Sequence, residues 1–240
     1  MGIKESNELS DREIEILEKV VSEYVKSAKP ISSKYLEARY DFKISPATIR
    51  GEMHELTKKG YLLQPHTSAG RVPTDKGYRF FVNYKNKENE IINELGKAEK
   101  IIENQSNIFF VLDAVSRFLA ETSHNFAITG LLNQGFFSKD GWKHILQEPE
   151  FDDNEISLEF ANFISNFEKE IENLNMDSEA IIYIGSENPV DESSNFSIII
   201  ARCNFPQEQT GFISILGPKR MSYHRNICII NSITALLSEL

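Results

Sequence analysis

The chain of 240 residues has little of what disulfide-linked, secreted or membrane-spanning proteins are built from. Its two cysteines, Cys203 and Cys228, are too few for a disulfide framework. No apolar run approaches the ~18 residues that span a bilayer, and the first residues lack the apolar core of a secretion signal. These absences predict a soluble protein of the cytoplasm.

Patterns that indicate common chemistry are missing as well. The sequence has no Gly-rich phosphate loop, and its five histidines share no zinc-like spacing with one another or with a cysteine. No nucleophile stands in a pattern with a base. We therefore expect no cofactor, no metal ion and no enzymatic activity.

What is present is a globular composition with an uneven charge. Hydrophobic residues make up 40% and charged residues 26%, which fits one large or two small domains. The net charge of −10 argues against nucleic acid as a partner. Residues 26–85 nevertheless carry twelve Lys and Arg against five Asp and Glu, whereas residues 86–240 carry eleven against twenty-four. This division favours nucleic-acid binding by the first part, although charge also varies by chance along a chain.

Three short helices are predicted in the first 60 residues. A capping box at Ser10–Glu13 begins the first helix, and Ser32 or Ser33 can cap the second. Ser45-Pro46 begins the third, which ends at Gly60. Three short helices with a tight connector before the third are typical of a helix-turn-helix.

The third helix has two different sides. Ile49, Met53 and Leu56 fall on one side and are expected to pack inward. The other side is small and polar near its start, as a helix entering a major groove would need, or else it is an ordinary solvated face. The candidate DNA-binding residues on this helix are Ser45, Thr48, Arg50, Gly51 and His54.

A β-hairpin is predicted directly after the third helix. A strand at 61–64, a polar loop ending in Arg71 and a return at 72–73 form a wing, whose tip could enter a minor groove or contact phosphate. Thr74 then caps a helix that carries Tyr78, Phe80, Phe81 and Tyr84. At this spacing the aromatic residues are expected in the core, the alternative being base stacking.

The remaining sequence indicates a helical connector and an α+β domain. Ile91, Leu95, Ala98 and Ile102 repeat at heptad spacing, so residues 86–122 are either a dimer-forming connector or a helix packed on its own domain. A helix with an apolar stripe follows from Asp153 or Asn154. Strands are expected at 180–184, 196–203 and 211–216, and a last helix at 223–237, which together fit an antiparallel sheet.

Several segments resemble one known family. Pro65–Arg79, together with Ser45–Arg50 and Gly60–Leu62, closely resembles the heat-inducible transcription repressor family HrcA. Leu146–Phe151, Ile184–Pro189 and Leu216–Tyr223 resemble its later motifs, which adds support from the second half of the chain.

The resemblance implies a two-domain repressor that binds double-stranded DNA at an inverted-repeat operator upstream of chaperone genes. It implies a winged helix-turn-helix domain at 1–85, the connector at 86–122 and a GAF-like domain at 123–240, shortened between Gly130 and Gly141. It also implies a homodimer whose activity depends on the GroEL chaperonin, with no membrane partner. In this picture Ser32 and Ser33 contact phosphate at a helix N-terminus. Thr48, Arg50, Gly51 and His54 face bases, and the wing presents His66, Ser68 and Arg71.

Two other functions remain open at this point. The GAF-like part could bind a small ligand or another protein that controls DNA binding, and a ligand retained on purification would favour this. An enzyme is the third and least supported option.

Overall fold

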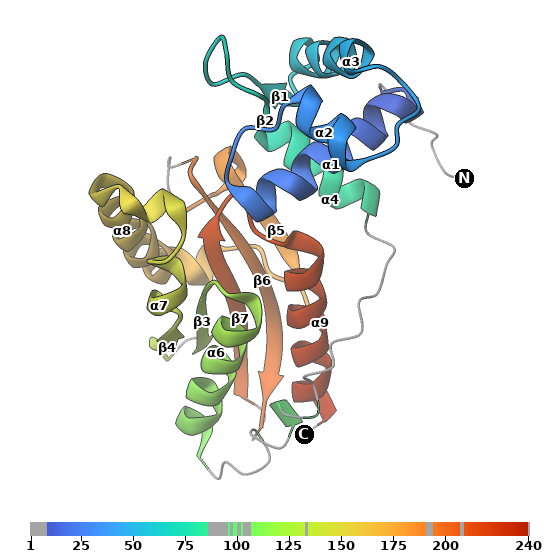
Figure 1. The fold of residues 1–240 in the computed structure, drawn as a ribbon. Helices are drawn as coiled ribbons and strands as arrows, with labels where there is room; N and C mark the ends of the chain where they lie inside the picture. Colours follow the sequence, from blue (N-terminus) through green and yellow to red (C-terminus); the bar gives the residue numbers. More distant parts are fainter. Residues whose placement is uncertain are drawn as a thin grey trace. The chain divides into compact units, whose positions relative to one another are not determined.

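Two units make up the chain, Met1–Asn86 and Lys87–Leu240 (Figure 1). The computed structural model describes residues 9–85, 96, 98–99, 102, 107–132, 134–190, 194–206 and 209–239. Ile91 and Leu95 of the predicted connector lie outside the described residues, whereas Ala98 and Ile102 are buried.

The first unit contains helices and a short antiparallel hairpin in the predicted order. Ser10 closes a capping box with Glu13, and Ser32 and Ser45 are the N-caps of the next two helices. The third helix ends before Gly60, whose φ of +79° is left-handed. The elements are α1 (Asp11–Ser27), α2 (Ser33–Arg39), α3 (Pro46–Lys58), β1 (Leu62–Leu63), β2 (Val72–Pro73) and α4 (Asp75–Lys85).

The aromatic residues of α4 divide between core and surface. Tyr78 and Phe81 are buried, as predicted. Phe80 is half-buried and stacks on Tyr84, which is 51% exposed. The expectation of core positions is therefore right for the first pair and wrong for Tyr84.

The second unit is built on a five-stranded sheet in which every pairing is antiparallel, as predicted. The strand order is β4-β3-β7-β6-β5. The strands are β3 (Phe126–Leu131), β4 (Phe136–Asp140), β5 (Ile181–Ile184), β6 (Phe196–Phe205) and β7 (Gln209–Pro218).

Helices cover both faces of this sheet. Helices α6 (Ile108–Ser123) and α9 (Tyr223–Glu239) pack against each other and against the sheet (Figure 1). Helix α8 (Asn154–Glu170) packs its phenylalanines on the other face, where Phe160 contacts Phe126 and Phe196 edge-on. Three layers thus enclose the core. The short helices are α7 (Trp142–Ile145), η1 (Pro149–Asp152), η2 (Ile171–Asn173) and η3 (Gly185–Glu187).

The segment 86–122 had two alternatives, a dimer-forming connector or a helix packed on its own domain. Its second half is α6, which packs on β3 and β4, so the second alternative holds there. The segment from Gly130 to Gly141, where the sequence indicates a shortened domain, forms the β3–β4 hairpin.

Candidate nucleic-acid interface

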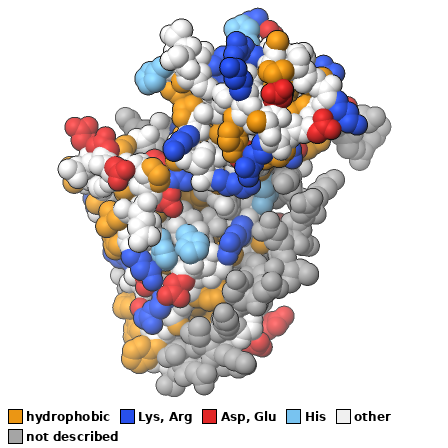
Figure 2. Space-filling view, viewed as in Figure 1, with side chains coloured by type: hydrophobic (Ala, Val, Ile, Leu, Met, Phe, Trp, Pro, Cys, Tyr) orange, Lys and Arg blue, Asp and Glu red, His pale blue; other side chains and the backbone are white. Residues whose placement is uncertain are grey.

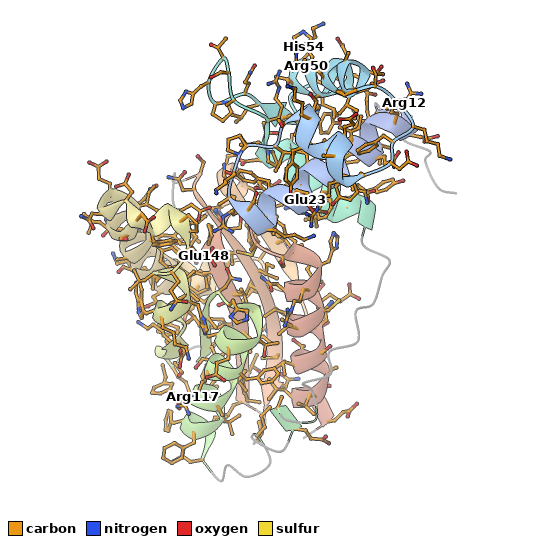
Figure 3. All side chains as sticks on the ribbon, in the orientation of Figure 1. Arg12, Glu23, Arg50, His54, Arg117 and Glu148 are labelled. Carbon is orange, nitrogen blue, oxygen red and sulfur yellow. The ribbon has the colours of Figure 1, made fainter. Side chains whose placement is uncertain are left out.

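Helix α3 separates a buried side from an exposed one. Ile49, Met53 and Leu56 are at most 3% exposed and pack against α1 and α2. The opposite side is open to solvent, and Arg50 and His54 lie on it (Figure 3). All five candidate residues of this helix and its cap are exposed: Ser45, Thr48, Arg50, Gly51 and His54.

The start of α3 is held by its own polar residues. Ser45 Oγ accepts a hydrogen bond from the Thr48 backbone N–H at 3.2 Å, and the two hydroxyl oxygens lie 3.0 Å apart. Pro46 supplies the fixed φ of the first helical position. The first turn of α3 is therefore rigid, although its side chains are exposed.

The loop between β1 and β2 is shaped by hydrogen bonds to its backbone. The Gln64 side-chain amide donates to the carbonyls of Thr67 and Ala69 at 2.8 and 3.0 Å. Ile31 and Arg71 exchange two backbone hydrogen bonds of 2.9 and 2.7 Å, which tie the loop to the residues before α2. His66 and Ser68 are exposed on this loop.

A cleft of 320 Å³ opens between the start of α2, α3 and the 64–71 loop. It brings together half of the ten candidate residues, from three separate segments of the chain. Ser45, Thr48, Gly51, His54 and His66 do not line it. The candidate residues that do are Ser32, Ser33, Arg50, Ser68 and Arg71.

The charge around this cleft is positive. Burial, and then the nearby charge of Arg50, lower the pKa of Arg71. No Asp or Glu is among the cleft residues. Lys and Arg side chains are spread over the visible face of the first unit (Figure 2).

Glu23 is a buried carboxylate on α1 that contacts α2. It was not identified from the sequence. Glu23 accepts hydrogen bonds from the hydroxyls of Tyr35 and Tyr40 at 2.5 and 2.7 Å and lies 3.2 Å from Arg39 Nε. Burial alone would raise the pKa of Glu23, but these partners lower it to about 2. Tyr35 and Arg39 lie on α2, and Tyr40 is its C-cap. Glu23 therefore helps to fix the position of that helix.

The family-like motifs of the second unit also meet in space. Arg220, from the motif Leu216–Tyr223, forms ion pairs with Glu148 and Glu150 of the motif Leu146–Phe151. Its Nε lies 2.5 Å from Glu150 Oε1. In the motif Ile184–Pro189, the side-chain amide of Asn188 donates to the carbonyls of Gly185 and Phe196. These motif residues have structural roles that hold the sheet and its helices together.

Other kinds of site find little support among the residues that the structure describes. No group of three or more His, Cys, Asp or Glu there could hold a metal ion. Both cysteines are free, and burial raises the pKa of the Cys203 thiol. None of the described helices is long and apolar enough to cross a membrane.

Residues 82–227, more than half of the chain, match the family described as "HrcA protein C terminal domain". The chain belongs to the HrcA family. The resemblance predicted from the motifs is thereby confirmed.

Two HrcA relatives extend over almost all of this chain. A "Heat-inducible transcription repressor HrcA" from Thermoanaerobacter sp. (strain X514) is 30% identical over 332 aligned positions, with 97% of both chains covered. One from Thermodesulfovibrio yellowstonii is 26% identical over 343 positions, with 96% of this chain and 99% of the relative covered. Both alignments are longer than the 240 residues here, so these HrcA proteins have segments without a counterpart in this chain.

One solved structure shares the fold. A crystal structure described as a hypothetical protein has a TM-score of 0.70 and 18% sequence identity, covering 97% of this chain and 98% of its own. At this identity the likeness concerns the fold alone.

Proposed function

We propose that this HrcA-family chain is a DNA-binding transcriptional repressor of chaperone genes. Its relatives are named for heat-inducible repression. The first unit would act as a winged helix-turn-helix domain, with α3 in the major groove and the 64–71 loop as the wing. The observation that carries this proposal is the exposed, polar side of α3 beside a positively charged cleft.

The exposed residues divide by their position. Thr48, Gly51 and His54 would face base edges from α3. His66 and Ser68 would meet the duplex from the wing, and Ser32 at the start of α2 would lie against the backbone. Phosphate contacts position the protein, whereas base contacts give specificity.

The repressor would act as a homodimer in the cytoplasm. An inverted-repeat operator presents two half-sites related by a two-fold axis, which calls for two copies of the first unit. The second unit, GAF-like in this proposal, would hold the copies together and receive regulation. The GroEL chaperonin would keep the repressor competent, so that unfolded proteins competing for chaperonin release the genes.

A salt titration of DNA binding tests the proposal. We expect the full chain to bind an inverted-repeat duplex from a chaperone-gene promoter at least ~10³-fold more tightly than a scrambled duplex. Affinity for both should fall linearly with the logarithm of salt concentration, because binding releases counterions from the phosphates. Equal affinity for the two duplexes would contradict the proposal.

A repressor controlled by a small ligand is the second candidate. A cleft of 480 Å³ in the second unit, lined by Met176, Arg202 and Asn204 among others, favours it. A molecule that co-purifies with the chain and changes operator affinity, with chaperonin having no effect, would select this candidate over control by GroEL.

A further inference from the structure

The cleft between α2, α3 and the 64–71 loop holds two arginines without negative partners. Neither Arg50 nor Arg71 forms an ion pair within the part of the chain that the structure describes. Two positive charges that share one 320 Å³ cleft repel each other, and an anion between them would remove that repulsion.

Arg71 is held in place at the wall of this cleft. Its Nε donates to Thr57 Oγ1 at 3.0 Å and its Nη1 to the Gly70 carbonyl at 3.4 Å. Thr57 Oγ1 in turn donates to the Met53 carbonyl at 2.8 Å. The guanidinium is thus oriented before any ligand arrives, which lowers the entropy cost of binding.

The Ser33 hydroxyl adds a neutral donor to the same cleft. Ser33 lines the cleft, and its Oγ forms no hydrogen bond with another described residue, so it is free to donate to a ligand. Gly70 also lines the cleft, and it lies so close to Ile31 that a Cβ would stand 2.3 Å from the Ile31 carbonyl oxygen.

We propose that this cleft binds one phosphodiester of the duplex backbone, with Arg50, Arg71 and the Ser33 hydroxyl as its donors. The proposal rests on DNA binding by the first unit. A phosphodiester has one negative charge and two free oxygens, which match forked guanidinium donors and a hydroxyl. In this proposal Arg50 contacts phosphate and makes no base contact. Thr48, Gly51 and His54 make the base contacts.

The test compares affinity for the inverted-repeat and scrambled duplexes over a range of salt concentrations. Arg50→Gln changes an exposed side chain that has no hydrogen-bond or ion-pair partner among the described residues, so we expect the fold to be unaffected. We expect it to weaken binding to both duplexes equally, by roughly tenfold or more, and to reduce the salt slope by about 0.9. Ser33→Ala should weaken binding to both with an unchanged slope, because a hydroxyl carries no charge.

Arg117→Gln is the matched control, because it removes an exposed guanidinium from the second unit and should leave both affinities unchanged. A loss confined to the inverted repeat would overturn the proposal by assigning Arg50 to base reading. Unchanged binding of Arg50→Gln to both duplexes would also overturn it, while the proposed repressor function would stand.

A titration with inorganic phosphate tests whether the cleft binds the duplex backbone or a free phosphate ion. The NMR shifts of the Ser33 and Gly70 amides should respond more to the duplex than to phosphate at equal ionic strength. If wild-type chain binds neither duplex while phosphate saturates these shifts, the occupant is a free phosphate, and both this proposal and the repressor function fail.

Discussion

Glu23 is a buried carboxylate that connects two helices of the first unit. It is 2% exposed and joins α1 to Tyr35 and Arg39 of α2 and to Tyr40 just beyond. Removing one partner from a buried charged network leaves the others unsatisfied. The position of α2, and with it one wall of the cleft, therefore depends on this carboxylate.

Glu23→Gln should lower the stability of the first unit at pH 7 by roughly 2 kcal/mol. The pKa of Glu23 is lowered from 4.5 to about 2 on folding, so its contribution is present above pH 4.5 and is lost as the pH falls toward 2. Urea unfolding followed by NMR signals of the first unit, at pH 7 and pH 3, should show this acid sensitivity reduced in the variant. Glu15→Gln, an exposed change on the same helix, should behave as wild type.

Two glycines of the first unit predict opposite effects of the same substitution. A Cβ at Gly51 or at Gly60 would meet no atom within 4 Å, but Gly51 lies inside α3 and Gly60 has a φ of +79°. We expect Gly51→Ala to stabilise by about 1 kcal/mol and Gly60→Ala to destabilise by roughly 1–2 kcal/mol. Urea midpoints measure both, and changes of the same sign would be contrary to this reasoning.

Gly51→Ala should also weaken operator binding, although it stabilises the fold. The open space around Gly51 shows that packing within the chain does not require a glycine there. If the added methyl group leaves operator affinity unchanged, close approach of α3 to the bases does not explain why position 51 is a glycine.

The residues of α3 could be predicted from the sequence, whereas Glu23 could not. Helical spacing separates Ile49, Met53 and Leu56 from the exposed side, since the period of the helix alone decides it. Glu23 gains its partners from α2 and the residue that follows it, and a lone carboxylate in a helix usually faces solvent. Pairing between helices has no local signal in the sequence.

At the scale of elements, two backbone hydrogen bonds between Ile31 and Arg71 tie the wing to the segment before α2. The Ile31–Arg71 bridge needs Gly70, because a Cβ there would stand 2.3 Å from the Ile31 carbonyl oxygen. We expect Gly70→Ala to break this bridge, destabilise the first unit by about 1–3 kcal/mol and weaken DNA binding.

Amide hydrogen exchange at Ile31 and Arg71 measures the loss of the bridge directly. Both amides donate in the bridge and should exchange faster in Gly70→Ala. Thr67→Ala, an exposed change in the same loop, should leave their exchange slow. Slow exchange in Gly70→Ala as well would mean that the loop accommodates the methyl group.

In the second unit the ion pairs of Arg220 connect two motifs. Arg220 is 9% exposed on its side chain and faces Glu148 and Glu150. Arg220→Met should cost about 3 kcal/mol, because it leaves two carboxylates together without their cation. Trp142 fluorescence during urea unfolding measures the stability of this unit. As a control, Arg202→Met removes an exposed arginine that forms no ion pair within the described part of the chain, and it should change stability little.

Among the elements, the strands with a regular sequence pattern could be predicted, whereas a strand that forms by pairing with a neighbour could not. The strands expected at 180–184, 196–203 and 211–216 occur at 181–184, 196–205 and 209–218. Strand β4 lacks clear alternation, since Phe136 and Phe137 are adjacent, and it forms by pairing with β3. The partner of a strand, and not its own periodicity, decided this part of the fold.

At the scale of the whole molecule, charge and symmetry determine how DNA would be bound. A chain with a net charge of −10 would reach a polyanion through its basic first unit. Sedimentation should find two chains on a duplex with both half-sites and one, more weakly held, on a single half-site. One chain bound per complete inverted repeat would contradict the proposed homodimer.

The ionised Glu23 also determines how the cleft responds to a change in cellular pH. A carboxylate with a pKa of about 2 keeps its charge in a mildly acidic solution. The contacts between α1 and α2 should therefore survive mild acidification of the cell interior, and with them the shape of the cleft beside α3.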